Sequence, residues 1–232
     1  MPFFLDPLLY VFIAPALLLA LVASLMVRSA YSHARQIPAR MSGYAAARHI
    51  LDSAGLYDVG IEQVPGHLSD HYDPRDKVLR LSPEVYHDHS MAAVGIAAHE
   101  AGHAIQDAHR YLPLVVRNFA VPAANFGSSL GMVLIMIGLM ASFYQLAWLG
   151  VILFSGVAFF QLVNLPVEFD ASSRAKALLV DEGIVDAQEM SAVRKVLNAA
   201  ALTYVAATLQ SLLTVLYYVL RIVSQSQSQR EE

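Results

Sequence analysis

Residues 91–108 read MAAVGIAAHEAGHAIQDA, a run of small and apolar residues that contains two histidines four positions apart. Ser90 precedes the run as a candidate N-cap, so the pattern predicts one helix over 91–108. Residues four apart lie on one face of a helix, so His99 and His103 can bind one Zn²⁺ while Glu100 reaches a water molecule beside the metal. The spacing therefore indicates a site for metal-assisted hydrolysis.

The composition is typical of an integral membrane protein, because 56% of the residues are hydrophobic, 15% are charged and the mean hydropathy is +0.49. The net charge is −4 and no dense basic block occurs, which argues against a nucleic-acid partner. The chain contains no cysteine. Any metal must therefore be held by His, Asp or Glu.

Four stretches have about the 20 apolar residues that a membrane-spanning helix needs. We expect a transmembrane anchor within residues 1–28 and transmembrane helices over 119–143, 146–163 and 199–223. No Lys or Arg precedes the first apolar run, so the anchor is expected to be retained rather than cleaved as a signal peptide. Only residues 144–145 separate the second span from the third, which predicts a tight antiparallel hairpin.

Two polar segments, 29–118 and 164–198, are separated by two of these crossings and should therefore face the same compartment. Of the 15 Lys and Arg, 13 lie in residues 28–118 and 164–198. The positive-inside rule then predicts that both segments, and any site they form, lie in the cytoplasm. The tail 224–232, with its Ser-Gln repeat, has too little apolar surface to fold and is expected to be disordered.

The first polar segment contains the patterns of a small α+β structure. An amphipathic helix is expected over 43–54, ended by Gly55. Residues 59–64 and 77–81 alternate apolar and polar positions, and the turn-forming residues between them predict a hairpin of these two strands. Such a strand beside an active site could bind an extended peptide through main-chain hydrogen bonds. Ser82 is expected to begin a further helix.

The motif itself leaves the third metal ligand open. His109 occupies the position of the third histidine in a longer version of the motif, but that version needs glycine at 106 and here the residue is Gln106. A continuing helix would carry His109 about 15 Å from His99 along its axis. We therefore expect His109 at the end of the helix, and Asp107 is a more distant alternative.

Glu168, in the run LPVEFDASS, is the better candidate for the third ligand because it is expected on the same side of the membrane as the histidines. Pro166 suits the first turn of a helix. Two His and one Glu leave a fourth tetrahedral position open, as a catalytic zinc site requires. Asp170 and Ser172 are close enough in sequence to orient a zinc-bound imidazole. The alternative is that Glu168 is an interfacial acid paired with Arg174 or Lys176.

Hydrolysis of a peptide also needs a group that stabilises the oxyanion. His71 and Tyr72 precede the second predicted strand and can both donate hydrogen bonds, so they are candidates for this catalytic role. The alternative for each is an ordinary surface residue of a turn.

Three stretches carry a resemblance to a known family: HEAGHAI at 99–105, DHYDPR at 70–75 followed by LRLS at 79–82, and PVEFDAS at 166–172. Over about residues 44–177 the chain resembles the YugP-type bacterial membrane zinc metallopeptidases, and more distantly the HtpX-type gluzincin membrane proteases. The HtpX-type proteins carry an Asp four residues after the glutamate ligand, where this chain has Ser172. The resemblance implies a neutral metallopeptidase with a Zn²⁺ cofactor in a bacterial cytoplasmic membrane.

The fold class that we expect is a mainly α membrane protein, with about four transmembrane helices and a small α+β zincin-like domain at the membrane surface. The expected partners are the lipid bilayer and polypeptide substrates, either membrane proteins or unfolded chains. Accessory membrane proteins and homo-oligomers stay open. Two alternatives to an enzyme also stay open: a membrane scaffold with a structural zinc, and a chaperone-like adaptor that works by binding.

Overall fold

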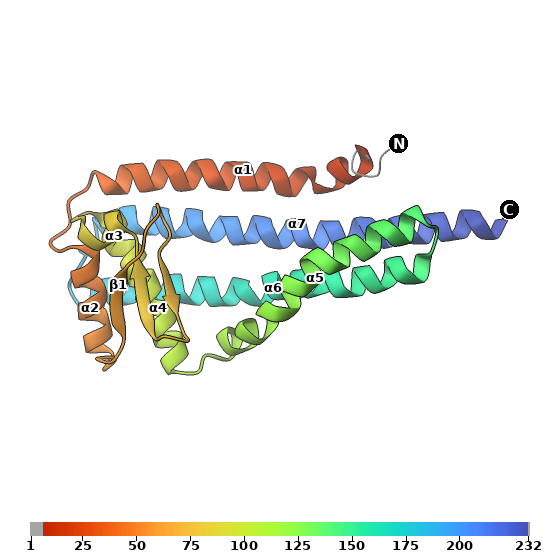
Figure 1. The fold of residues 1–232 in the computed structure, drawn as a ribbon. Coiled ribbons are helices and arrows are strands. Elements are labelled where there is room, and N and C mark those ends of the chain that lie inside the picture. The colour runs from red at the N-terminus through yellow and green to blue at the C-terminus, as the bar shows by residue number, and fades with distance from the viewer. Residues whose placement is uncertain (1–6, 232) are drawn as a thin grey trace. The chain divides into compact units, whose positions relative to one another are not determined.

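Ten helices and strands make up the computed structural model, which describes residues 7–231, with side chains as far as residue 227 (Figure 1). They are α1 (Pro7–Arg35), α2 (Gly43–Ser53), β1 (Gly60–Gln63), β2 (His71–Asp73), β3 (Val78–Leu81), α3 (Pro83–His87), α4 (Met91–Ala108), α5 (Leu112–Met140), α6 (Tyr144–Asp181) and α7 (Met190–Glu231). Contacts divide the described chain into an apolar unit, residues 7–22, 116–165 and 203–231, and a polar unit, residues 23–115 and 166–202.

The apolar unit consists of parts of α1, α5, α6 and α7, the four described helices that are long and apolar enough to cross a membrane. The four predicted spans fall on these helices, although the first six residues of the predicted anchor lie outside the described part. The turn between α5 and α6 lies at 141–143, slightly before the predicted break. A Cβ added to Gly127 would lie 2.2 Å from the carbonyl oxygen of Leu153, so α5 and α6 pack with their backbones in contact.

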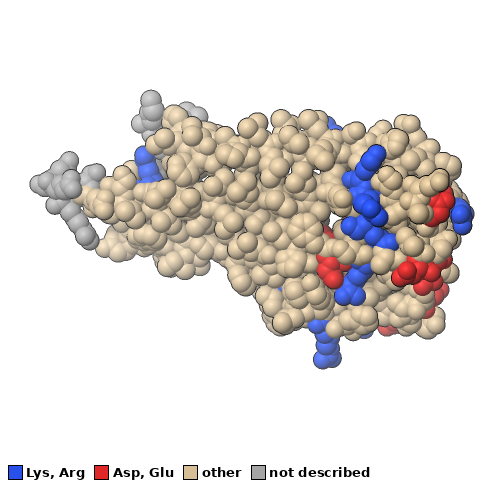
Figure 2. Space-filling view, turned by 180° about the vertical axis from the view of Figure 1, so that it is seen from behind, with Lys and Arg blue, Asp and Glu red and all other residues tan. Residues whose placement is uncertain are grey.

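Charged side chains are distributed unevenly over the surface. On the face drawn in Figure 2 they gather over one region, and a large region carries almost none. The sequence agrees, since Lys and Arg occur in the described apolar unit only at positions 117, 221 and 230. A surface of this kind is suited to the hydrocarbon core of a bilayer.

Two predicted boundaries in the long helices are wrong. α7 continues to Glu231, so the predicted disordered tail is helical over 224–231, and residue 232 lies outside the described part. Pro166 lies inside α6 rather than in the first turn of a new helix. Apolar residues on both sides of Pro166 favour one continuous helix, and proline removes only its own N–H from the hydrogen-bond ladder.

The polar unit contains a three-stranded sheet with the strand order β1-β3-β2. β1 is parallel to β3 and β2 is antiparallel to it, with Gly60 opposite Val78 and Tyr72 opposite Leu79. The predicted hairpin of residues 59–64 with 77–81 is therefore wrong, because β2 and β3 form the hairpin. Asp73 closes its turn, since its Oδ1 accepts a hydrogen bond of 2.9 Å from the Arg75 N–H.

α4 lies at the centre of the polar unit, where it contacts α2, α3, β2 and β3. It spans Met91–Ala108 as predicted, and the Oγ of Ser90 caps it by accepting a 3.3 Å hydrogen bond from the Ala93 N–H. The predicted amphipathic helix is confirmed as α2, and Gly55 follows it with φ +74°. Large buried side chains around α4 include Ile50, Leu51, Leu79, Leu81, Leu179 and Val193. This packing fixes the helix that carries the histidines.

Candidate metal centre

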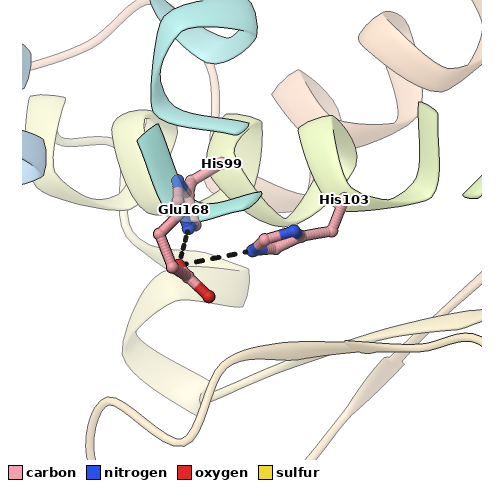
Figure 3. A group of neighbouring side chains, drawn as sticks. All are labelled: His99, His103 and Glu168. Atoms are coloured by element: carbon pink, nitrogen blue, oxygen red, sulfur yellow. Dashed lines mark hydrogen bonds and ion pairs between the residues drawn. The ribbon is translucent and has the colours of Figure 1, made fainter. Parts of the chain in front are cut away.

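His99 and His103 lie one turn apart on α4, and their rings meet edge to face with centroids 4.7 Å apart. Glu168, on α6, points at both rings (Figure 3). Its Oε2 lies 3.3 Å from the Nε2 of His99 and 3.6 Å from the Nε2 of His103. Glu168, which is 65 or more positions from either histidine in the sequence, thus converges with both on one point.

These three side chains fit a zinc ion. One ligand atom from each lies within 4.8 Å of the other two, and the group is the one of its kind found among the described residues. Zinc bonds of about 2.0–2.1 Å in a tetrahedron put neighbouring ligand atoms about 3.3 Å apart, close to the two measured separations. A set of two imidazoles and one carboxylate is also one that catalytic zinc sites use.

Gly102 allows α6 to approach α4 at this point. A Cβ on Gly102 would lie 2.9 Å from the carbonyl oxygen of Ala171, which is closer than a real Cβ contact. Ala171 is three residues after Glu168, so the glycine opens the space in which the carboxylate reaches the two histidines.

Both imidazoles have a hydrogen-bonding partner on the nitrogen that faces away from Glu168. Ser172 Oγ lies 3.2 Å from the Nδ1 of His99. The Nδ1 of His103 lies 3.0 Å from the Oε1 of Gln106. Such partners fix the orientation of a ligating imidazole and direct Nε2 toward a metal.

Gln106 is the residue of the site that sequence reasoning missed. The sequence distinguishes Gln106 only because a longer version of the motif has glycine at this position. Its Nε2 donates hydrogen bonds to the Val167 carbonyl at 2.9 Å and to the Asp170 Oδ2 at 2.8 Å, so Asp170 reaches His103 through Gln106. The spacing of three residues between His103 and Gln106 on one helix face was the available signal.

Glu100 is nearly buried, with 8% of its surface exposed, and its carboxylate forms no hydrogen bond within the described part of the chain. The negative charge of Glu100 affects the pKa of His103. Burial lowers the pKa of His103, but the carboxylate of Glu168, which can accept a hydrogen bond from a protonated Nε2, and the charge of Glu100 outweigh burial and raise it. Glu100 is thus a nearly buried carboxylate that has no hydrogen-bonding partner in the described chain and directly follows a candidate zinc ligand.

In the described part of the chain, neither His71 nor Tyr72 forms a side-chain hydrogen bond or ion pair with the three candidate ligands. The Tyr72 hydroxyl donates to the Asp107 Oδ2 at 2.9 Å, and burial together with this bond raises the pKa of Tyr72. His71 is exposed, with its Nδ1 2.8 Å from the Ser69 carbonyl. Their oxyanion role stays a prediction. The alternative ligands Asp107 and His109 do not join the three: the Asp107 carboxylate accepts a hydrogen bond from Tyr72, and His109 is exposed at the C-cap of α4.

Known proteins resemble the chain over nearly all of its length. A family model described as "putative neutral zinc metallopeptidase" matches residues 9–223. One relative, "Putative membrane protease YugP" of Bacillus subtilis (strain 168), is 46% identical over 215 residues, which cover 91% of this chain and 96% of the relative. No solved structure matches the chain.

Proposed function

Since this chain belongs to the family of neutral zinc metallopeptidases, we propose that it hydrolyses peptide bonds at a zinc site formed by His99, His103 and Glu168. The observation that carries the proposal is the convergence of these three ligand atoms within 4.8 Å of one another, beside a carboxylate that has no hydrogen-bonding partner in the described chain.

When bound there, zinc would supply a Lewis acid that polarises the peptide carbonyl and lowers the pKa of water. Glu100 accepts the proton of the attacking water and passes it to the leaving amine. Ser172 and Gln106 hold the two imidazoles with their Nε2 atoms turned toward Glu168, so little reorganisation is needed before reaction.

An extended peptide is the substrate form that the neighbouring sheet favours. β2 is an edge strand, paired only with β3 among the described strands. It contacts α4, the helix of the two histidines. A free strand edge can add a peptide by main-chain hydrogen bonds. His71 and Tyr72 lie on this strand, and they remain our candidates for hydrogen bonds to the oxyanion.

We place the enzyme in a bacterial cytoplasmic membrane with its site on the cytoplasmic side. Four described helices are long and apolar enough to cross a bilayer, and the similar protein of Bacillus subtilis is named a membrane protease. Of the 15 Lys and Arg, 13 lie in residues 28–118 and 164–198, as the positive-inside rule requires of cytoplasmic segments. Loops of membrane proteins and unfolded chains near the surface are then the substrates within reach.

The variant E100Q tests the enzymatic role. Full-length protein in detergent should keep its zinc, measured by mass spectrometry, while hydrolysis of fluorescent casein falls about 10²–10⁴-fold because the proton acceptor is gone. E182Q is the matched control, since the Glu182 carboxylate pairs with the Nε2 of His49, 3.1 Å from it, and takes no part in the site. This variant should cleave casein like wild type. Wild-type hydrolysis by E100Q would refute the role of Glu100. Zinc-loaded wild type that binds casein without cleaving it would favour the adaptor, and one that does neither would favour the scaffold.

A further inference from the structure

Gln106 is completely buried, with no exposed surface, although glutamine is rarely found fully inside a protein. A buried amide is costly unless its polar atoms are hydrogen-bonded. Here the carbonyl oxygen and the amide nitrogen both have partners, and those partners belong to two helices far apart in sequence: His103 on α4, and Val167 and Asp170 on α6.

These partners allow only one orientation of the amide. The Val167 carbonyl and the Asp170 carboxylate can only accept hydrogen bonds, so the atom facing them must be the donating Nε2. The oxygen of the amide then faces His103, and an amide oxygen can only accept. The Nδ1 of His103 must therefore carry the hydrogen, which leaves the lone pair on Nε2, the nitrogen directed at Glu168.

The same amide also holds the helix of the third ligand. Val167 directly precedes Glu168, and Asp170 follows it by two residues, so the two bonds from Gln106 hold α6 on both sides of Glu168. Asp170 is itself fixed by the Arg174 Nε at 2.6 Å, and the Arg174 guanidinium lies over the Tyr111 ring, 5.9 Å from its centre. A chain of contacts from Arg174 to His103 thus passes through one amide.

We propose that Gln106 is a positioning residue of the zinc centre, which sets the tautomer of His103 and holds His103 and Glu168 at the separation that zinc requires. The proposal rests on the proposed zinc site. It assigns to Asp170 the task of orienting the amide of Gln106 rather than the imidazole directly.

The test measures zinc affinity in full-length protein by competition with a chelator. Q106L keeps the approximate size of the side chain and removes all three hydrogen bonds, and zinc affinity should fall about 10–100-fold. Q161L, a glutamine substitution on α6 in the apolar unit, is the control and should bind zinc like wild type. The thermal unfolding of metal-free protein shows separately how much of any effect comes from stability alone.

A second pair of variants guards against simple misfolding. Q106E keeps an acceptor for His103 but sets a carboxylate against Asp170, so it should also weaken zinc binding. In Q106E/D170N the new amide at 170 can donate to the carboxylate at 106, which removes the repulsion between two carboxylates, so zinc affinity should rise above that of Q106E. It should stay below that of wild type, because the carboxylate at 106 still faces the Val167 carbonyl. The absorption bands of bound Co²⁺, which report ligand geometry, should shift in Q106L and return toward wild type in the double variant.

The zinc affinities of wild type and variants decide whether Gln106 positions the zinc ligands. Wild-type zinc affinity in Q106L, or a double variant no better than Q106E, overturns the role of Gln106. Zinc-binding wild type that cleaves no peptide refutes the proposed function and leaves the role of Gln106 standing, because the measurement is of affinity. Wild type that binds no zinc overturns both.

Discussion

His109 follows His103 by six residues, yet it lies exposed at the C-cap of α4. Glu168, which is 65 residues after His103, lies against both histidines. We therefore expect E168A to lose most of its zinc on dialysis, because one of three ligands is gone, and H109A to retain it. Mass spectrometry of the metal content decides between the two. Full zinc in E168A combined with loss in H109A would show that Glu168 is not the ligand.

Single residues of the site differ in how far the sequence could reveal them. His99, Glu100 and His103 follow from one helical spacing, which is local and needs no tertiary information. Glu168 was predicted as a ligand from the membrane topology, which puts it on the same side as the histidines, and from the resemblance to known families. No role could be assigned to Gln106 from the sequence, because its partners on α6 lie 61 and 64 positions away and no local pattern shows that they are in contact with it.

At the scale of elements, Gly102 is a position at which the backbones of α4 and α6 approach closely beside the site. We expect G102A to lose about 1–3 kcal/mol of stability and to bind zinc more weakly, since the new Cβ would lie 2.9 Å from a backbone oxygen of Ala171. G95A is the comparison, because its Cβ would meet the Val193 side chain at 2.9 Å, and a side chain yields more easily than a backbone. Chelator competition and thermal unfolding measure both effects. Equal zinc affinity in the two variants would remove the special role of Gly102.

The β2–β3 turn should contribute a pH-dependent part of the stability. The hydrogen bond from Arg80, and then that from the Arg75 N–H, hold the pKa of Asp73 below its ordinary value. A carboxyl with a lowered folded-state pKa stabilises the fold above its unfolded-state pKa, about 3.9, and this contribution is lost as the pH falls through the folded value.

D73N keeps a side-chain oxygen for the Arg75 N–H but loses the charge. Its melting temperature should therefore lie below that of wild type at pH 7, and the gap should close as the pH falls below about 4. Circular dichroism at a series of pH values measures it. A gap that stays constant down to pH 3 would contradict the assigned cause.

The sheet shows which features of an element the sequence can reveal. Residues 59–64 and 77–81 were predicted as strands from their alternation, and β1 and β3 lie there. Their pairing was wrong because β2 has three residues, too few for an alternating pattern, and fell within the predicted turn. The side-chain hydrogen bond at Asp73 places the real turn, and such a bond is visible only in the structure.

For the whole molecule, the four apolar helices were predictable because length and hydropathy are properties of the chain itself. The ends of those helices were not. The Ser-Gln tail lacks an apolar pattern, and its helix over 224–231 continues from α7. Proline often lies in the first turn of a helix, but Pro166 lies within a long apolar helix here.

Sidedness is the property of the whole molecule on which the proposed substrates depend, and the absence of cysteine makes it directly measurable. In Y57C the new thiol replaces a side chain that is 75% exposed in the polar segment, and in S142C it lies in the turn between α5 and α6. If the polar segments are cytoplasmic, a membrane-impermeant maleimide added to intact cells should label S142C and spare Y57C. Inverted vesicles should give the opposite result. Permeabilised cells should label both variants, and the cysteine-free wild type neither. Labelling of Y57C in intact cells would put the zinc site outside, and its substrates would then be extracytoplasmic.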